Sequence, residues 1–300
     1  MKLLHKLMGE TAVAGALPVS EHLMLIDPKL MQRALSATAP EVAMVGECAA
    51  SPLREMAAEG VPVDVIGRTA VVPVVGMTNK RFQAAGFIAS YNAISLAVNA
   101  AVADKQIDSI MLHIDSPGGY VSGIASVADD IHKAAQQKHV VAQVDGLGAS
   151  AAYWIASQAN EIVAGRLDVV GSIGVMTAIY DVSKLFAEAG IKTEVFSTGK
   201  FKTAGLEGTS LTDEQRKEIQ SEVDALGDAF VADIVRGRAM DEKAVRAVAD
   251  GRVFQASEAV SNGLIDGIAT PQETLQRLNA SSARRGKMRN ARLEVAQSGM

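Results

Sequence analysis

The chain has 300 residues, of which 48% are hydrophobic and 21% are charged, and its net charge at pH 7 is −5. This apolar fraction can fill a core and excludes wholesale disorder, while the aromatic share of 4% means that aliphatic side chains build that core. The single cysteine, Cys48, excludes an internal disulfide framework and a cysteine-based zinc cluster, and no run of about 18 apolar residues is present to span a membrane.

Residues 1–65 are predicted to form a leader and a linker. Lys2 and Lys6 precede an apolar segment, but Gly9-Glu10-Thr11 interrupts it, so an amphipathic helix is expected rather than an export signal. The Ala-, Ser- and Pro-rich stretch Ser36–Pro52 has the composition of a linker. The folded domain is therefore expected to begin near residue 66.

Residues 66–270 alternate between strand and helix patterns. Apolar runs predict strands at Thr69–Met77, Ser109–Asp115, His139–Asp145, Glu161–Ala164 and Lys192–Ser197. Helical patterns predict helices at Ala89–Ala103, Val121–Ala135, Ser150–Ala159, Val182–Ala189, Thr212–Gly237 and Gln255–Gly263. This repeated alternation predicts an α/β fold with a mostly parallel sheet.

Residues 271–300 are predicted to form a basic, flexible tail. Five basic residues and one acidic residue between Ser281 and Met300 give this end a net charge of +4, which leaves −9 for the rest of the chain. A solvated tail is the simpler interpretation, and a docking segment for an acidic partner or nucleic acid is the alternative.

The first candidate motif is Asp115-Ser116-Pro117-Gly118-Gly119, which ends a predicted buried strand. Its two glycines allow the backbone to approach a ligand closely, with amides facing outward. Ligands of α/β sheets bind at the carboxyl ends of the strands, where this motif falls. An ordinary turn is the alternative interpretation.

The second candidate motif is Gly148-Ala149-Ser150-Ala151, in which Ser150 opens an Ala-rich helix. Free amides at a helix N-terminus favour developing negative charge, and the amide of Ala151 would help to bind an oxyanion. The alternative is a helix cap, because serine is a favoured N-cap residue. The pattern Gly-x-Ser-x-Ala differs from the nucleophile elbow of α/β-hydrolases.

Two kinds of base could activate Ser150. All five histidines precede it, and His113 lies in a buried-looking strand where a packed, hydrogen-bonded role is expected. Order alone does not exclude a Ser-His-Asp triad, but no feature of the sequence favours one. Lysine is the other choice, since burial beside Phe201 would lower the pKa of Lys200 or Lys202 toward ~7–8. Ser172 offers a hydroxyl that would orient a neutral amine.

Four motifs together resemble the signal peptide peptidase A family of serine proteases. They are Asp115-Ser116-Pro117-Gly118-Gly119, Gly148-Ala149-Ser150-Ala151-Ala152-Tyr153, Gly171-Ser172-Ile173-Gly174-Val175 and Ser197-Thr198-Gly199-Lys200-Phe201-Lys202. Each motif is weak alone, but the four in this order form a strong joint signal. The resemblance covers about residues 66–270, the expected protease domain, and implies a Clp-protease/crotonase-like α/β fold with βα repeats and peripheral helices.

The resemblance implies a Ser-Lys dyad that uses neither a cofactor nor a metal. It places the nucleophile at Ser150 and the general base at Lys202, with Ser172 as the hydroxyl that holds the lysine. The Clp-protease subunit resembles this fold too, but it uses a histidine after its serine, and no histidine follows Ser150 here. The oxyanion hole that the resemblance implies consists of backbone amides at Gly118 or Gly119 and Ala151.

Within the family, the layout resembles the head maturation proteases of lambda-like tailed phages. Membrane-associated members carry an anchor or export signal, and none is convincing here. We therefore expect a prohead protease that acts on capsid scaffold or portal proteins in the host cytoplasm or the assembling prohead. A homo-oligomer is expected, with Thr212–Gly237 as a candidate interface helix, and nucleic acid is expected to bind only through the basic tail.

Three alternatives remain. A bacterial enzyme similar to signal peptide peptidase would degrade cleaved signal peptides or small proteins. A crotonase-type acyl-CoA enzyme would share the fold and the glycine-rich oxyanion site, but it would not need Ser150 and Lys202 together. An inactive scaffold-binding protein is the third alternative, and the presence of both dyad residues disfavours it.

Overall fold

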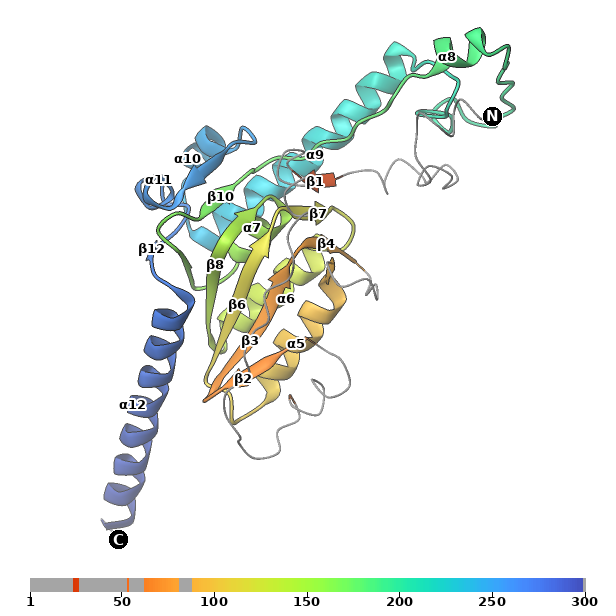
Figure 1. The fold of residues 1–300 in the computed structure, drawn as a ribbon. Coiled ribbons are helices and arrows are strands. Elements are labelled where there is room, and N and C mark those ends of the chain that lie inside the picture. Colours follow the sequence, from red (N-terminus) through yellow and green to blue (C-terminus); the bar gives the residue numbers. More distant parts are fainter. Residues whose placement is uncertain (1–23, 27–52, 54–61, 81–87, 299–300) are drawn as a thin grey trace. The chain divides into compact units, whose positions relative to one another are not determined.

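The structure is a computed structural model that describes residues 24–26, 53, 62–80 and 88–298 (Figure 1). The expected N-terminal helix and the linker Ser36–Pro52 lie outside these residues. The chain divides into a larger unit, residues 25–174 and 227–300, and a smaller unit, residues 1–24 and 175–226. The sequence predicts one protease domain over 66–270, whereas the structure divides that span between the two units.

An eight-stranded sheet forms the centre of the larger unit, and its main path runs β11-β10-β8-β6-β3-β2, with β9 beside β8 and β12 beside β9. The inner strands pair in parallel, and the edge strands β2 and β11 pair antiparallel. The predicted α/β fold is therefore confirmed. The strands are β2 (Asp64–Ile66), β3 (Thr69–Val75), β6 (Ser109–Ser116), β8 (His139–Ala149), β9 (Glu161–Ala164), β10 (Val169–Gly171), β11 (Val253–Gln255) and β12 (Gly267–Ile268).

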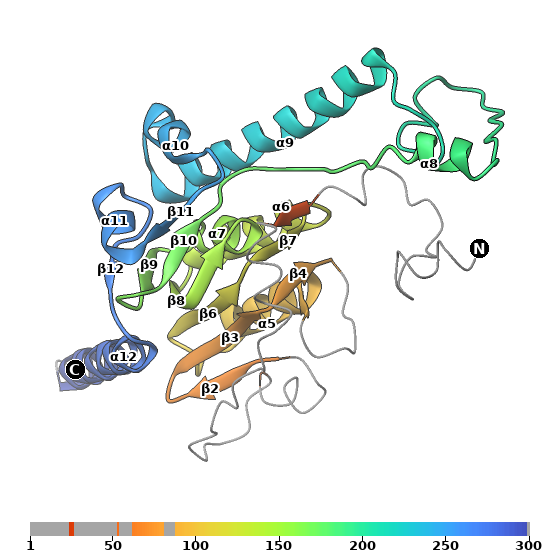
Figure 2. The same ribbon diagram turned by 45° about the horizontal axis from the view of Figure 1, so that its top comes forward.

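Helices cover the two faces of this sheet. On one face lie α5 (Tyr91–Ala103) and α6 (Ile124–Ala135), whose buried residues recur at helical spacing and contact β3 and β8. Figures 1 and 2 show both helices behind the strands and α12 (Pro271–Ser298) apart from them. The Oγ of Ser90 accepts a hydrogen bond from the Ala93 N–H and caps α5, which explains why the helix begins at Tyr91.

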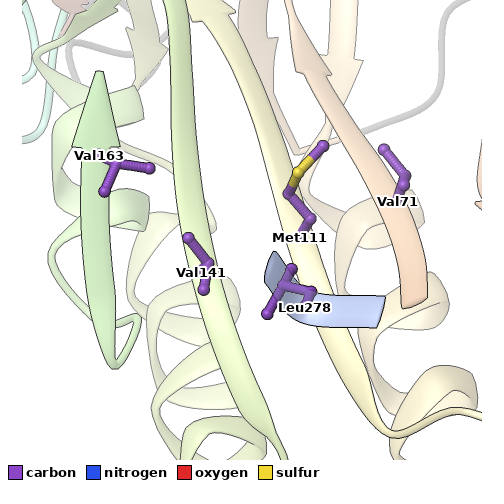
Figure 3. Packing of buried hydrophobic residues seen from close by; sticks show 5 residues of the cluster. All are labelled: Val71, Met111, Val141, Val163 and Leu278. Carbon is purple, nitrogen blue, oxygen red and sulfur yellow. The ribbon is translucent and has the colours of Figure 1, made fainter. Parts of the chain in front are cut away.

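The start of α12 packs on the opposite face of the sheet. Leu278 is 2% exposed and lies in one buried cluster with a side chain from each of four neighbouring strands (Figure 3): Val71, Met111, Val141 and Val163. Thr274, Leu278 and Ser282 recur every four residues and are all buried, so they form one helical stripe. The hydroxyl of Thr274 also donates to Gln143 Oε1. The segment expected to be a tail, residues 271–300, thus begins with helical turns that contact the sheet.

The remaining elements of the larger unit surround the carboxyl ends of the central strands. A four-stranded sheet has the order β1-β7-β4-β5. Its strands are β1 (Met24–Ile26), β4 (Met77–Asn79), β5 (Ile88–Ser90) and β7 (Gly118–Tyr120), and the short helices are α7 (Ala151–Ala156), α10 (Glu242–Val248) and α11 (Ala256–Ser261). The strand predicted over Thr69–Met77 is split at Gly76, whose φ of 77° turns the chain toward the second sheet.

In the smaller unit the sequence prediction fails at one segment. The apolar run predicts a strand at Lys192–Ser197, but no regular element forms there and Phe196 is 92% exposed. An apolar run becomes a strand only when a neighbouring strand satisfies its backbone groups. The predicted helix at Val182–Ala189 is confirmed as α8 (Ser183–Glu188).

The long helix α9 (Asp213–Arg238) begins as the sequence predicts. The Thr212 hydroxyl accepts from the Gln215 N–H at 3.1 Å, and Gln215 Oε1 accepts from the Thr212 N–H at 3.0 Å. This reciprocal pair is a capping box, which satisfies two free amides at the helix start. No helix in the described part of the chain combines the length and apolar character that a bilayer crossing requires.

The last residue of α9 is fastened to the sheet by an ion pair. Arg238 donates to both carboxylate oxygens of Asp266, at 2.7 and 2.8 Å, and the Ile162 N–H donates to the same carboxylate at 2.7 Å. Burial alone would raise the pKa of Asp266, but the hydrogen bonds from Arg238 and Ile162 outweigh it and hold the pKa below its usual value. The ionised carboxylate therefore stabilises the fold.

We expect Asp266→Asn to lower the free energy of unfolding at pH 7 by about 1–2 kcal/mol. This loss lies at the lower end for a charged hydrogen bond, because Asp266 is partly exposed and solvent screens its charge. A depressed pKa gives stability that is present above the unfolded-state value of about 3.9 and is lost as the pH falls through the folded-state value. The difference between parental and variant chains, measured by urea unfolding, should therefore shrink as the pH falls below about 4. A difference that does not change with pH would contradict this account.

Candidate active site

Three of the four motifs meet at the carboxyl ends of β6, β8 and β10. Ser116 pairs with Gly148 across β6 and β8, and Ala149 pairs with Gly171 across β8 and β10. The next residue, Ser150, donates its N–H to the Gly171 carbonyl at 2.7 Å. Because α7 also contacts β7, the turn that holds Ser150 lies beside the strand that contains the two glycines of the first motif.

Ser150 has an unusual backbone and an unpartnered side chain. Its φ of 55° and ψ of −122° fall in a region that L-residues rarely adopt, at a cost of about 1–3 kcal/mol. The residue is 1% exposed, and its Oγ has no hydrogen-bond partner among the described residues. Although Ser150 occupies the N-cap position of α7, its side chain makes no capping hydrogen bond. The helix-cap interpretation of this serine is therefore wrong.

The first motif requires glycine at both of its last positions. Gly118 has a φ of 100°, and its N–H donates to Ser116 Oγ at 3.2 Å. A Cβ on Gly119 would lie 1.8 Å from the carbonyl oxygen of Thr78, which belongs to the neighbouring strand β4. The close pairing of β7 with β4 thus fixes the backbone of the predicted oxyanion loop. Ala151, the third predicted donor, is fully buried as the first residue of α7.

Ser172 is joined to Ser150 through the hydrogen bond that its preceding residue accepts. It follows Gly171, whose carbonyl accepts from the Ser150 N–H, and its own N–H donates to the Arg252 carbonyl at 2.8 Å. Ser172 also has a positive φ, 52°, and Ala239 is the one other non-glycine residue of the described ranges that shares this property. Strained residues gather at functional sites more often than elsewhere, so two of them at adjacent strand ends mark this region.

Lys202 belongs to the smaller unit, so its geometry is described apart from that of Ser150. It lies in a turn, where its N–H donates to the Gly199 carbonyl at 3.1 Å. Its side chain is exposed within this unit. Lys200 is engaged differently, because it pairs with Glu214 and lies 4.9 Å from the centre of the Phe201 ring. No ion pair joins Lys202 to another described residue.

A cluster of titratable groups that the sequence reasoning missed lies before Ser150 on the strand ends. His113 Nε2 is 2.9 Å from Asp145 Oδ2, so the packed, hydrogen-bonded role expected for His113 is confirmed. Burial raises the pKa of Asp115, and the charge of Asp145 adds to the rise, while His113 and the Leu147 N–H oppose it. The available signal was the spacing of His113 and Asp115, two polar residues on one face of an apolar strand.

Within the described ranges, no three His, Cys, Asp or Glu side chains are arranged to hold a metal ion.

Several curated proteins are similar to this chain. Serine protease SPPA of the Arabidopsis thaliana chloroplast is 33% identical over 55% of this chain and 24% of its own length. Capsid assembly protease C of Escherichia phage lambda is 28% identical over 76% of this chain and 53% of its own, and head-tail preconnector protein GP5 of Enterobacteria phage P21 is 28% identical over 70% and 42%. The chain spans between a quarter and about half of the length of these three relatives.

A sequence model of peptidase family S49 matches residues 132–284, which is just over half of the chain. The matched span contains Ser150, Ser172 and Lys202, while the glycines of the first motif precede it. The resemblance to the signal peptide peptidase A family, drawn from the four motifs, is confirmed by this match and by the SPPA relative. The chain therefore belongs to peptidase family S49.

Proposed function

We propose that this protein is a serine endopeptidase in which Ser150 is the nucleophile and Lys202 is the general base. The observation that supports this most directly is the buried, unpartnered hydroxyl of Ser150 on a strained turn. A buried polar atom without a partner costs stability, so it is unusual outside a functional site. Membership of a peptidase family supports the same assignment.

In the proposed reaction, neutral Lys202 accepts the proton of Ser150 Oγ as the oxygen attacks the scissile carbonyl carbon. The amides of Gly118 or Gly119 and of Ala151 stabilise the oxyanion, and Ser172 orients the lysine. Lys202 then gives its proton to the leaving amine, and a water molecule hydrolyses the acyl-enzyme. Each step conserves the dyad, so neither a metal nor a cofactor is required by this proposal.

The proposal places one requirement on Lys202. A lysine acts as a base near neutral pH only when desolvation lowers its pKa, and Lys202 is exposed in the smaller unit. The bound substrate or another protein surface must therefore cover Lys202 in the active enzyme. This requirement suits the homo-oligomer that we propose, because a neighbouring subunit would supply such a surface.

We further propose a role in phage head maturation, in which the enzyme cleaves scaffold, capsid or portal proteins in the host cytoplasm or the assembling prohead. Similarity to the capsid assembly protease of phage lambda over 76% of the chain supports this role. A signal-peptide-degrading role is the second candidate, and the 33% identity to SPPA supports it. The two roles share the dyad and differ in the substrate.

We expect Ser150→Ala and Ser150→Gly both to abolish covalent labelling by a fluorophosphonate probe, because each removes the nucleophilic oxygen. The two variants should differ in stability, since glycine adopts a positive φ without strain and alanine does not. Thermal or urea unfolding should show Ser150→Gly to be more stable than Ser150→Ala by about 1 kcal/mol. Labelling of either variant at the parental rate would exclude Ser150 as the nucleophile.

We expect Lys202→Arg to reduce peptide cleavage by about 100-fold or more, because arginine cannot lose its proton to serve as a base. Lys200→Arg is the matched control, since an arginine can keep the ion pair with Glu214. Initial cleavage rates of both variants between pH 6 and pH 10 give the test. Equal loss in the two variants would contradict the assignment of Lys202.

We expect co-expression with capsid scaffold and portal proteins to yield truncated products that intact-mass spectrometry detects, and the Ser150→Ala chain to yield none. Synthetic signal peptides, incubated with both chains, form the second arm. Dyad-dependent cleavage of signal peptides without cleavage of the capsid proteins would contradict the phage role and favour the second candidate.

A further inference from the structure

The pairing of β6 with β8 is interrupted just before the turn that holds Ser150, which is called the nucleophile turn below. Ile114 pairs with Val144 and Ser116 pairs with Gly148, so a single residue of β6, Asp115, lies opposite three residues of β8. These three residues, Asp145–Leu147, are called the β8 bulge below. Bulges of this kind bend a strand and redirect the side chains that follow it. A slip of one residue would turn every later side chain to the opposite face of the sheet.

Two side chains of β6 hold the three residues of the β8 bulge. His113 and Asp115 are two residues apart on one strand, so they lie on the same face of the sheet. His113 Nε2 contacts the carboxylate of Asp145, the first bulge residue, at 2.9 Å. The carboxylate of Asp115 lies over Gly146, where a Cβ would come within 3.0 Å of Oδ1.

Asp115 also reaches the third bulge residue. The N–H of Leu147, three residues before Ser150, favours the ionised form of this carboxylate and so lowers its pKa. Gly146, between the two held residues, has a φ of 107°, which permits the sharp course of the bulge. The side chains of His113 and Asp115 thus face the β8 bulge at its first two positions, and the Leu147 N–H acts on the Asp115 carboxylate from the third.

The backbone of Asp115 belongs to the other half of the site. Its carbonyl accepts from the Gly76 N–H at 2.9 Å, and the next residue, Ser116, receives the Gly118 N–H on its Oγ at 3.2 Å. Asp115 therefore joins the proposed oxyanion loop through its backbone and the nucleophile turn through its side chain. A change in the Asp115 side chain would therefore alter the position of the nucleophile turn relative to the proposed oxyanion loop.

We propose that Asp115 is a positioning residue, whose carboxylate holds the β8 bulge in the register that directs Ser150 Oγ toward the oxyanion-binding amides. This inference rests on the proposed function of Ser150. Asp115 is not assigned any contact with the substrate or with Ser150 itself. The contact between His113 Nε2 and Asp145 Oδ2 supports the same bulge from its first residue.

The fold alone gives little reason to place a carboxylate here. Three charged groups act on Asp115: Asp145 and Asp168 are like charges, and His113 is the one opposing partner. Because burial and these neighbours raise the pKa of Asp115, the ionised form costs stability at neutral pH. A residue that costs stability while it fixes geometry near a nucleophile fits a functional role better than a structural one.

The test compares the fluorophosphonate labelling rate of Ser150 with the unfolding midpoint of each full-length variant. We expect Asp115→Ala to slow labelling by about 100-fold, the effect of displacing a reacting group by about 1 Å. Asp115→Asn keeps an oxygen that can accept from the Leu147 N–H, so it should restore labelling to within about 10-fold of the parental rate. At pH 7 it should be at least as stable as the parental chain.

Two control variants remove similar interactions at the far ends of the same strands. Asp108→Asn breaks the ion pair with Arg68 near the start of β6, and His139→Gln breaks the contact with Glu161 at the start of β8 and β9. Both are expected to label at the parental rate, whatever their effect on stability. His113→Gln, in contrast, should slow labelling because it frees the first bulge residue.

The outcomes separate this inference from the proposed function. A parental chain that the probe does not label would overturn the proposed function and this inference together. A labelled parental chain with an equally fast Asp115→Ala variant would overturn the inference alone. Labelling rates that fall in proportion to stability across the Asp115 variants and the controls would show a structural role only, and would also overturn it.

Discussion

The break in register between β6 and β8 is the constraint on which the rest of the site depends. Up to Val144 the two strands pair residue by residue, and the face of β8 is decided by the hydrophobic core. Beyond the bulge, Gly148 pairs on both sides, with Ser116 of β6 and Val170 of β10, and Ala149 pairs with Gly171 of β10. Ser150 therefore leaves a strand whose register has been reset, and its direction follows from the length of the bulge rather than from local helix propensity.

The strain at Ser150 persists because the helix that follows is firmly anchored. All six residues of α7 are buried. Trp154 stacks on Phe230 with ring centres 4.4 Å apart, and its Nε1 donates to Asp233 at 2.7 Å. The Trp154 N–H also donates to the carbonyl of Ser150 at 2.9 Å. An unfavourable backbone of about 1–3 kcal/mol is thus offset by burial of two large aromatic rings and several smaller side chains.

The parts of the fold that follow from hydrophobic patterning were predictable from the sequence. The apolar runs of β6, β8 and β9 fix the parallel sheet, and the box formed by Thr212 and Gln215 marks the start of α9. Patterning fails where an element depends on a distant partner. The exposed run at Lys192–Ser197 has no neighbouring strand among the described residues, whereas the polar sequence of α12 forms a helix because one narrow stripe meets the sheet.

The site was predictable to the same extent. Glycines and serines at strand ends point to turns with free amides, and three such turns followed by the motif Ser197–Lys202 indicate the family. The sequence pattern contains nothing that reveals the φ of Ser150 or the opposition of Asp115 to three residues of β8, since both depend on strand register. Register is a property of two strands together, so a single chain segment does not display it.

The two members of the proposed dyad differ in how far the folded chain already buries and orients them. Ser150 is buried, oriented and unpartnered within the larger unit, so its geometry is complete in the folded chain. Lys202 lies in a unit where α8 buries no residue and where Tyr180 and Phe196 are exposed, so this unit has little apolar material of its own around a lysine. Desolvation is what makes a lysine a base. The proposed dyad therefore depends on a surface that covers Lys202, whereas the backbone of Ser150 is already fixed within the larger unit.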